Sequence, residues 1–254
     1  MLCEWYVKPM KIIDIIFRWL FILCLPLLLV TASLRIPANV PYMYYYFFQK
    51  YEVGTTTGFD NTTLKSIASG LVRYFNSNEE YINLTVTRDS QPFQVFNERE
   101  IIHLKDVKGL FQLDLWVFLG TAAFALFYVV FNLWRSQESR RKLARALVIG
   151  GGLTLGIMII LGIGILLDFD ELLLRFHLLS FANDFWLLDP AHDYLIMLVT
   201  GGFMYDATLT VAGATVTGAV VLGGLGTGYL LYRRRNGKEL HPAEKKDSRT
   251  ENII

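Results

Sequence analysis

The sequence is poor in cysteine and lacks several motifs that mark common catalytic sites. Cys3 precedes the first long apolar run and Cys24 lies inside it, so no disulfide framework is indicated. No CxxC pair with zinc-site spacing occurs, and HExxH is also missing. The absence of a GxSxG motif counts against the nucleophile elbow of the α/β-hydrolases.

Charge is also scarce. Only 19% of the residues are charged, whereas about 25% is usual for a soluble domain. The net charge is +1, so an acidic polymer such as a nucleic acid is not indicated as a partner. What the chain has in abundance is apolar residues, 53% of the total, and they are clustered into long runs.

Four of these runs are long enough to cross a bilayer. A transmembrane helix needs about 20 consecutive apolar residues, and backbone groups in hydrocarbon must be hydrogen-bonded within their own segment. We therefore predict an α-helical integral membrane protein with four transmembrane helices and a small α+β extracytoplasmic domain. The predicted organisation is transmembrane helix 12–36, extracytoplasmic α+β domain 37–112, transmembrane helix 113–134, cytoplasmic linker 135–143, transmembrane helix 144–167, extracytoplasmic helical loop 168–206, transmembrane helix 207–232 and cytoplasmic tail 233–254.

The distribution of charge predicts the orientation. Lysine and arginine gather before the first span, in the linker 135–143 and directly after the fourth span. The loop 168–206 instead carries seven acidic residues against Arg175 alone. Because basic residues near span ends remain in the cytoplasm, we expect cytoplasmic termini and two outer segments.

The first outer segment combines helical and extended patterns. Apolar residues recur at helical spacing over 63–75, with Asn61 or Thr62 as the expected N-cap. Residues 81–87 alternate like a strand, and 93–96 could pair with them. A unit of this size buries little core alone, so we expect it to rest on the membrane or on the other loop.

Further helices are predicted directly before the second span and directly after the third span. Asn97 should cap a helix that leads into the second span. In the other loop we expect a largely apolar helix over 168–183 at the membrane interface. We expect another that begins at Asp189–Pro190 and ends before Gly201.

Glycines at four-residue spacing occur in the third and fourth spans. These pairs are Gly152 with Gly156 and Gly224 with Gly228. Small residues at this spacing let helix backbones approach each other closely in a membrane. We therefore expect helix contacts at these positions.

Histidines in the outer segments are the candidates for chemistry. His103, His177 and His192 all lie there, and imidazole gains or loses a proton near neutral pH. Together with an aspartate they could bind zinc, and Ser180, one turn from His177, could act as a nucleophile. From the residues alone, the chain predicts an outer, interfacial site for an amphiphilic substrate.

Two motifs resemble a known family. The run NEREIIHLKDVK, residues 97–108, is similar to a signature of the bacterial lipoprotein intramolecular transacylases, Lit. So is the run 176–190 together with 193–196. The sequence departs from the family at Leu104, where methionine is expected, and at Leu179-Ser180, where aromatic character is expected.

The resemblance implies an enzyme of the bacterial cell membrane without a cofactor or metal. It would move the sn-2 acyl chain of a diacylglyceryl-modified N-terminal cysteine to the α-amino group of the same lipoprotein. Its partners would be such lipoproteins and membrane lipid, and the active site would face outward. It implies His177 as base and His103 as its partner. Supporting or substrate-binding roles fall to Arg99, Glu100, Asp106, Asp170, Asn183 and Trp186.

Within that scheme, Glu100, Asp106 or Asp170 could orient an imidazole. Arg99 and Asn183 could polarise the ester carbonyl. Two other classes stay open: a non-enzymatic membrane scaffold or sensor, and a metal-dependent membrane hydrolase. A separation of the two histidines much beyond about 8 Å would exclude their action on one ester.

Overall fold

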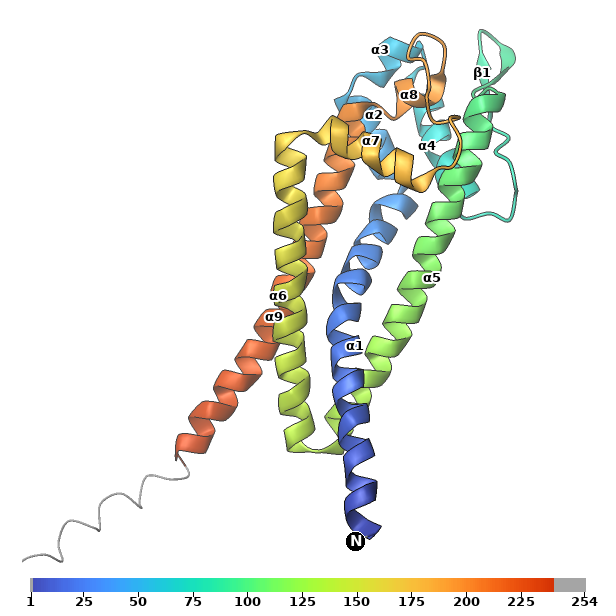
Figure 1. The fold of residues 1–254 in the computed structure, drawn as a ribbon. Coiled ribbons are helices and arrows are strands. Elements are labelled where there is room, and N and C mark those ends of the chain that lie inside the picture. Colours follow the sequence, from blue (N-terminus) through green and yellow to red (C-terminus); the bar gives the residue numbers. More distant parts are fainter. Residues whose placement is uncertain (1, 240–254) are drawn as a thin grey trace, which may run out of the picture. The chain divides into compact units, whose positions relative to one another are not determined.

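The computed structural model describes residues 2–239, which are mostly helical. The long elements are α1 (Leu2–Asn39), α5 (Glu98–Arg135), α6 (Gln137–Leu167) and α9 (Gly201–Glu239) (Figure 1). The short elements are α2 (Pro41–Lys50), α3 (Val53–Thr57), α4 (Asn61–Phe75), β1 (Thr85–Arg88), β2 (Gln91–Gln94), α7 (Phe169–Ser180) and α8 (Tyr194–Leu198). Most of the predicted tail 233–254 lies outside the described residues, and its first part continues α9.

The four long helices confirm the prediction of four segments able to cross a membrane. The apolar part of α1, Ile12–Ile36, coincides with the predicted first span. Helix α5 begins at Glu98, as the predicted cap at Asn97 requires, whereas α9 begins at Gly201, earlier than the predicted start at 207. In each case the polar outer segment continues into the apolar span as one helix without a break.

The described chain divides into two compact units. One contains the residues up to Pro26, Ala123–Leu155 and the residues from Thr217 onward; the other contains Leu27–Ala122 and Gly156–Val216. The basic stretches that predict the cytoplasmic side all fall in the first unit. Both predicted outer segments fall in the second unit.

A hydrophobic core holds the second unit together. Helix α4 lies close to its predicted position, and its Leu64, Ile67 and Leu71 are buried. They share this core with Leu198 of α8 and Phe203 of α9. The segment 37–112 is therefore completed by residues of the second predicted outer segment, which explains how so small an α+β unit can bury a core.

The N-cap of α4 is Asp60, so the prediction of Asn61 or Thr62 was wrong. The Asp60 carboxylate accepts a hydrogen bond of 2.7 Å from the backbone N–H of Thr63. Asn61 and Thr62 already lie in the first helical turn. An aspartate at this position suits a helix N-terminus because it satisfies one of the unpaired N–H groups there.

The strands form an antiparallel hairpin that is shifted from the predicted ranges. β1 pairs with β2 in the register Thr85 to Gln94 and Arg88 to Gln91. Asp89 and Ser90 both have positive φ, of 52° and 63°, as in the two-residue turns that suit strand twist. The paired residues therefore begin directly next to the turn, at Arg88 and Gln91. The alternation of apolar and polar residues did not indicate where this turn lies.

The second predicted outer segment contains less helix than expected. Helix α7 ends at Ser180 rather than at residue 183, and the next helix begins at Tyr194 rather than at the predicted Asp189–Pro190. Asp189 instead forms a turn in which its Oδ1 accepts the backbone N–H of Ala191 at 2.9 Å. The short helix α8 follows at Tyr194.

Gly201 and Gly202 begin a helix rather than end one. The Thr200 hydroxyl accepts a hydrogen bond of 3.1 Å from the backbone N–H of Phe203 and so caps α9. The Tyr51 ring lies against Gly202, where a Cβ would clash with it. Tyr51 also donates a hydrogen bond of 2.8 Å to Asp206, one turn further along α9.

Glycines bring helices together in the first unit, but at positions other than those predicted. A Cβ at Gly226 would lie 2.6 Å from the carbonyl oxygen of Ala144, and one at Gly151 would lie 2.9 Å from that of Ala219. A Cβ at each member of the predicted pairs, residues 152, 156, 224 and 228, would have no neighbour within 4 Å among the described residues. The spacing was recognised, but the contacting face was not.

Candidate functional site

His103 lies in the first turns of α5, whose start is fixed by a reciprocal cap. Asn97 Oδ1 accepts the backbone N–H of Glu100 at 3.1 Å, and Glu100 Oε2 accepts the backbone N–H of Asn97 at 2.7 Å. This is a capping box with asparagine in the cap position. It confirms the predicted role of Asn97 and sets the direction in which His103 leaves the helix.

The same cap ties α5 to the segment before α8. Asn97 Nδ2 donates to Asp193 Oδ1 at 2.7 Å. Glu100 Oε1 accepts the backbone N–H of Leu195 at 2.6 Å. The two sequence motifs therefore form one hydrogen-bonded structure.

His177 lies on α7, which begins at an N-cap formed by Asp168. The Asp168 carboxylate accepts the backbone N–H of Glu171 at 2.9 Å. His177 Nδ1 lies 2.8 Å from the carbonyl oxygen of Leu173, one turn earlier in the helix. Because a carbonyl can only accept, the proton resides on Nδ1, and Nε2 of the neutral ring has a free lone pair.

The two imidazoles lie close together among aromatic rings. Their centroids are 6.2 Å apart, which is within the separation that one ester requires. Phe181 lies 4.9 Å from the His103 ring and 5.6 Å from the His177 ring. Trp186 lies 5.0 Å from His177, so this predicted supporting residue belongs to the cluster.

His103 is buried, with 7% of its surface exposed, and its Nδ1 has no hydrogen-bond partner among the described residues. Burial of a charge without a partner is costly, so this environment favours the neutral ring. An unpaired polar atom beside a second histidine is a place where a substrate atom could bind.

The carboxylates considered for orienting an imidazole have other partners or positions. Both oxygens of Glu100 accept backbone N–H groups, and Asp106 Oδ2 accepts a hydrogen bond from Asn183 Nδ2 at 2.8 Å. Asp170 is exposed. Among the described residues, neither imidazole is hydrogen-bonded to a carboxylate, and the orienting group of His177 is a backbone carbonyl.

Arg99 and Asn183 hold the segment that follows α7. The Arg99 guanidinium donates to the carbonyl oxygen of Asp184. Asn183 bridges to α5 through Asp106 and accepts the backbone N–H of Phe185 at 3.1 Å. Both side chains therefore secure the chain between Phe181 and Trp186, which carries the rings around the histidines.

His192 is separate from the histidine pair. It is exposed, and its Nδ1 lies 2.8 Å from Asp189 Oδ2. Within residues 2–239, no group of three or more histidine, cysteine, aspartate or glutamate side chains is arranged to hold a metal ion. The zinc site considered from the sequence is thus not assembled by these residues.

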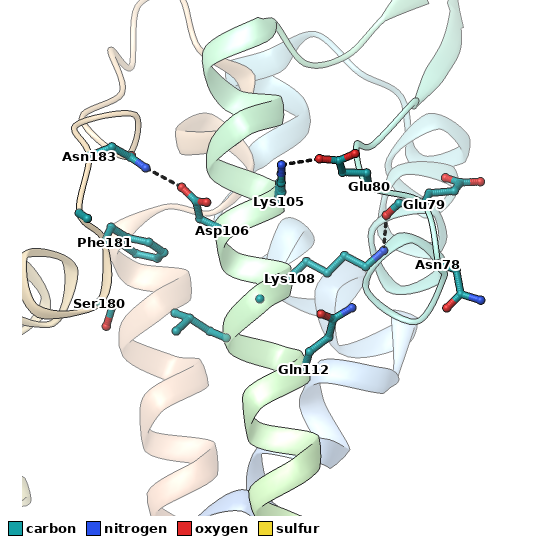
Figure 2. Close-up of a pocket in the computed structure, with 13 residues that line it drawn as sticks. Asn78, Glu79, Glu80, Lys105, Asp106, Lys108, Gln112, Ser180, Phe181 and Asn183 are labelled. Atoms are coloured by element: carbon teal, nitrogen blue, oxygen red, sulfur yellow. Dashed lines mark hydrogen bonds and ion pairs between the residues drawn. The ribbon is translucent and has the colours of Figure 1, made fainter.

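A pocket of about 600 Å³ lies on the side of α5 next to Phe181. Figure 2 shows Lys105, Asp106 and Lys108 projecting from α5 into this region, with Glu79 and Glu80 on one side and Asn183 on the other. Lys105 pairs with Glu80, and Lys108 Nζ donates to the carbonyl oxygen of Glu79 at 2.6 Å. Neither Phe181 nor this pocket was predicted, because no local pattern marks them.

Comparison with known proteins identifies the family. The family model described as lipoprotein intramolecular transacylase Lit matches residues 19–204. No curated protein sequence matches the chain.

The fold is similar to in meso structures of the membrane integral lipoprotein intramolecular transacylase Lit from Bacillus cereus. One has a TM-score of 0.71 and 16% identity, and the match covers 89% of this chain and 99% of that one. A variant of that protein with a histidine replaced by arginine has a TM-score of 0.72 and 18% identity, with 92% and 99% covered. A histidine-to-alanine variant has the same TM-score and identity, with 91% and 99% covered.

The family match covers most of the chain, and it supports a lipoprotein transacylase, an acyltransferase of the membrane that acts on lipoproteins. The similar structures are described as membrane integral, in agreement with the four helices of membrane length among the described residues. The chain therefore belongs to the lipoprotein intramolecular transacylase Lit family.

Proposed function

We propose that this chain moves the sn-2 acyl chain of a diacylglyceryl-modified N-terminal cysteine onto the α-amino group of that cysteine. The product is a lyso-form lipoprotein. The observation that carries the proposal is the pair of imidazoles, 6.2 Å apart, one of which has a free Nε2 lone pair.

Two protons leave the amine nitrogen, which is an ammonium group at neutral pH: one is released to solvent and the other ends on the glycerol oxygen. The amine nitrogen forms an amide bond to the acyl carbon, the ester bond to the glycerol oxygen breaks, and that oxygen receives a proton. An α-amino group has a pKa of about 8, so at neutral pH it is mostly protonated and a base must activate it. An acid must then protonate the departing oxygen.

His177 is suited to the role of base. Its Nδ1–H is held by the Leu173 carbonyl, so Nε2 can accept the proton of the amine. His103, whose pKa burial lowers to about 4, is neutral and serves as the second group by donating a hydrogen bond to the tetrahedral oxyanion, while the protonated His177 returns its proton to the leaving oxygen. Donor and acceptor belong to one substrate molecule, so positioning contributes much of the rate and no acyl-enzyme is required.

We further propose that the site lies at the outer membrane–water interface. Helix α7 exposes Leu178 and Leu179, which are 63% and 89% exposed, on the helix that carries His177. Apolar side chains on a helix with charged neighbours are typical of an interfacial segment. The basic ends of the spans and the acidic segment 168–206 support this proposal, with both termini in the cytoplasm and that segment outside.

The test is to replace His103 and His177 separately by alanine and to analyse lipoprotein N-termini by mass spectrometry. We expect each variant to lose about 100-fold or more of the activity, as is usual for the removal of an acid–base group. His192→Ala is the matched control, because this histidine is exposed and paired with Asp189.

Unchanged production of the lyso form by both His103→Ala and His177→Ala would overturn the proposal. That outcome would favour a non-enzymatic membrane scaffold or sensor. Loss of activity in all three variants would indicate a general effect on folding rather than on catalysis. Inhibition by chelators with stoichiometric zinc in the purified protein would favour a metal-dependent hydrolase.

A further inference from the structure

The pocket beside α5 shares a wall with the histidine pair. Phe181 lines the pocket and also contacts the His103 ring, at 4.9 Å between centroids. Ser180, Ala182 and Asn183 continue this wall. A substrate that reacts at the histidines can therefore extend past Phe181 into the pocket.

The lining of the pocket combines apolar surface from Leu110, Phe181 and Ala182 with side-chain amides and an ion pair, a mixture that suits a polypeptide. Asn78, Gln112 and Asn183 carry amides, which both donate and accept hydrogen bonds as a peptide backbone does. The side-chain amides of Asn78 and Gln112 are exposed and make no hydrogen bond to other described residues, so they are available to a ligand. An acyl chain in this place would remove the Glu80–Lys105 ion pair from water, which is costly.

The covalent structure of the substrate sets how far the pocket can lie from the reacting α-amino group. In the proposed reaction the nucleophile is the α-amino group of the first residue, so the polypeptide begins at the reacting atom. An extended chain advances about 3.3 Å per residue, which places the second to fourth residues within about 10 Å of it. The pocket begins at the ring that contacts His103, and its volume of about 600 Å³ lies within the range that holds small ligands.

We propose that this pocket binds the polypeptide segment directly after the acylated cysteine of the lipoprotein substrate. The proposal rests on the proposed function. The amides of Asn78 and Gln112 bind the backbone of the segment, and the Glu80–Lys105 pair lies beside its side chains.

Gly109 allows the pocket to be blocked without damage to the fold. It lines the pocket, and a Cβ added to it would have no neighbour within 4 Å. Gly109→Leu therefore fills the pocket while it replaces glycine by a better helix former. Gly120→Leu is the matched control, because Gly120 lies on the same helix and also faces open space, away from the pocket lining.

The experiment uses the purified full chain and two synthetic substrates. One is a diacylglyceryl-cysteine pentapeptide, and the other is diacylglyceryl-cysteine amide without further residues. We expect Gly109→Leu to lower N-acylation of the pentapeptide about tenfold or more, while N-acylation of the cysteine amide changes by less than about twofold. Gly120→Leu should leave both rates unchanged.

Equal loss on both substrates would overturn the proposal, because the pocket would then serve the acyl or glycerol part or the histidines themselves. Unchanged N-acylation of both substrates by Gly109→Leu would overturn the proposal as well. If wild-type protein N-acylates neither substrate, the proposed function fails instead. Binding is then decided separately with a pentapeptide that carries a benzophenone side chain at its third residue: photo-crosslinks to 78–80, 105–112 or 180–183 support the pocket, and crosslinks elsewhere refute it.

Discussion

The Glu100 carboxylate accepts a hydrogen bond of 2.6 Å from the backbone N–H of Leu195, although 95 positions separate the two residues. Only 1% of Glu100 is exposed, and its second oxygen accepts the backbone N–H of Asn97. One buried side chain thus joins the start of α5, which carries His103, to the start of α8. Glu100 was predicted as a group that could orient an imidazole, but both of its oxygens instead accept backbone N–H groups and connect two segments.

Replacement of Glu100 by alanine should therefore weaken the fold. It leaves two backbone N–H groups without partners, and a buried unpaired group costs roughly 1–3 kcal/mol. We expect a clear fall in the thermal unfolding midpoint of the detergent-solubilised protein. Glu98→Ala is the control, since Glu98 is exposed on the same first turn. Equal midpoints for the two variants would show that the connection contributes nothing.

Phe181→Ala should lower both stability and activity. The ring is buried and contacts both imidazoles, and truncation of a buried phenylalanine costs about 3–5 kcal/mol. Loss of this support should also reduce the N-acylation rate about tenfold or more, because the imidazoles lose their fixed orientation. Unfolding midpoints and rates measured on the same samples separate these effects. Phe185→Ala is the control: it should change the unfolding midpoint and the rate little, because 37% of Phe185 is exposed.

Gly226→Ala should destabilise the first unit. The new methyl group would lie 2.6 Å from the carbonyl oxygen of Ala144, so the two helix backbones would have to separate. Overpacking of this kind costs about 1–3 kcal/mol. Gly224→Ala provides the comparison, because its methyl group faces open space. The expected result is a lower unfolding midpoint for Gly226→Ala alone, and a lower midpoint for both would contradict this account of the contact.

The cap of α4 should make its first turn sensitive to acid. The hydrogen bond from the Thr63 backbone holds the pKa of Asp60 below its ordinary value of 3.8. A lowered pKa means that the carboxylate stabilises the fold above pH 3.8 and that this contribution is lost as the pH falls through the folded-state pKa.

Hydrogen exchange of the Thr63 amide provides the measurement. Asp60→Ala should speed this exchange at neutral pH, and the difference from wild type should disappear at acidic pH. Asp60→Asn keeps a neutral acceptor, so it should protect the amide with little dependence on pH. If the Thr63 amide still exchanges more slowly in wild type than in Asp60→Ala at acidic pH, this role of the carboxylate is ruled out.

Local patterns predicted the parts of the fold that local physics determines. The long apolar runs identified the four helices, and the periodicity of 63–75 identified α4. The hairpin was found but misplaced, because its register depends on the turn at Asp89 and Ser90. The predicted helix start at Asp189 was wrong because this aspartate caps a turn, and the dipeptide alone does not distinguish the two.

The candidate site could be predicted only in part. His103 and His177 stood out because histidines are few, and the resemblance paired them. The roles of Glu100, Arg99 and Asn183 depend on partners distant in sequence, such as Leu195 and Asp184. Phe181 carries no local signal, since it is one of many apolar residues and its importance arises from what it contacts.

The hydrogen bond from His177 Nδ1 to the Leu173 carbonyl makes proton transfer dependent on secondary structure. That carbonyl is available in this direction only while the turn between the two residues remains helical. Fraying of one turn would free the ring to rotate and to exchange tautomers, and the nitrogen aimed at the substrate would change. The reactivity of the base is thus linked to the local stability of a 12-residue helix, whose exposed leucines need an apolar surface to rest on.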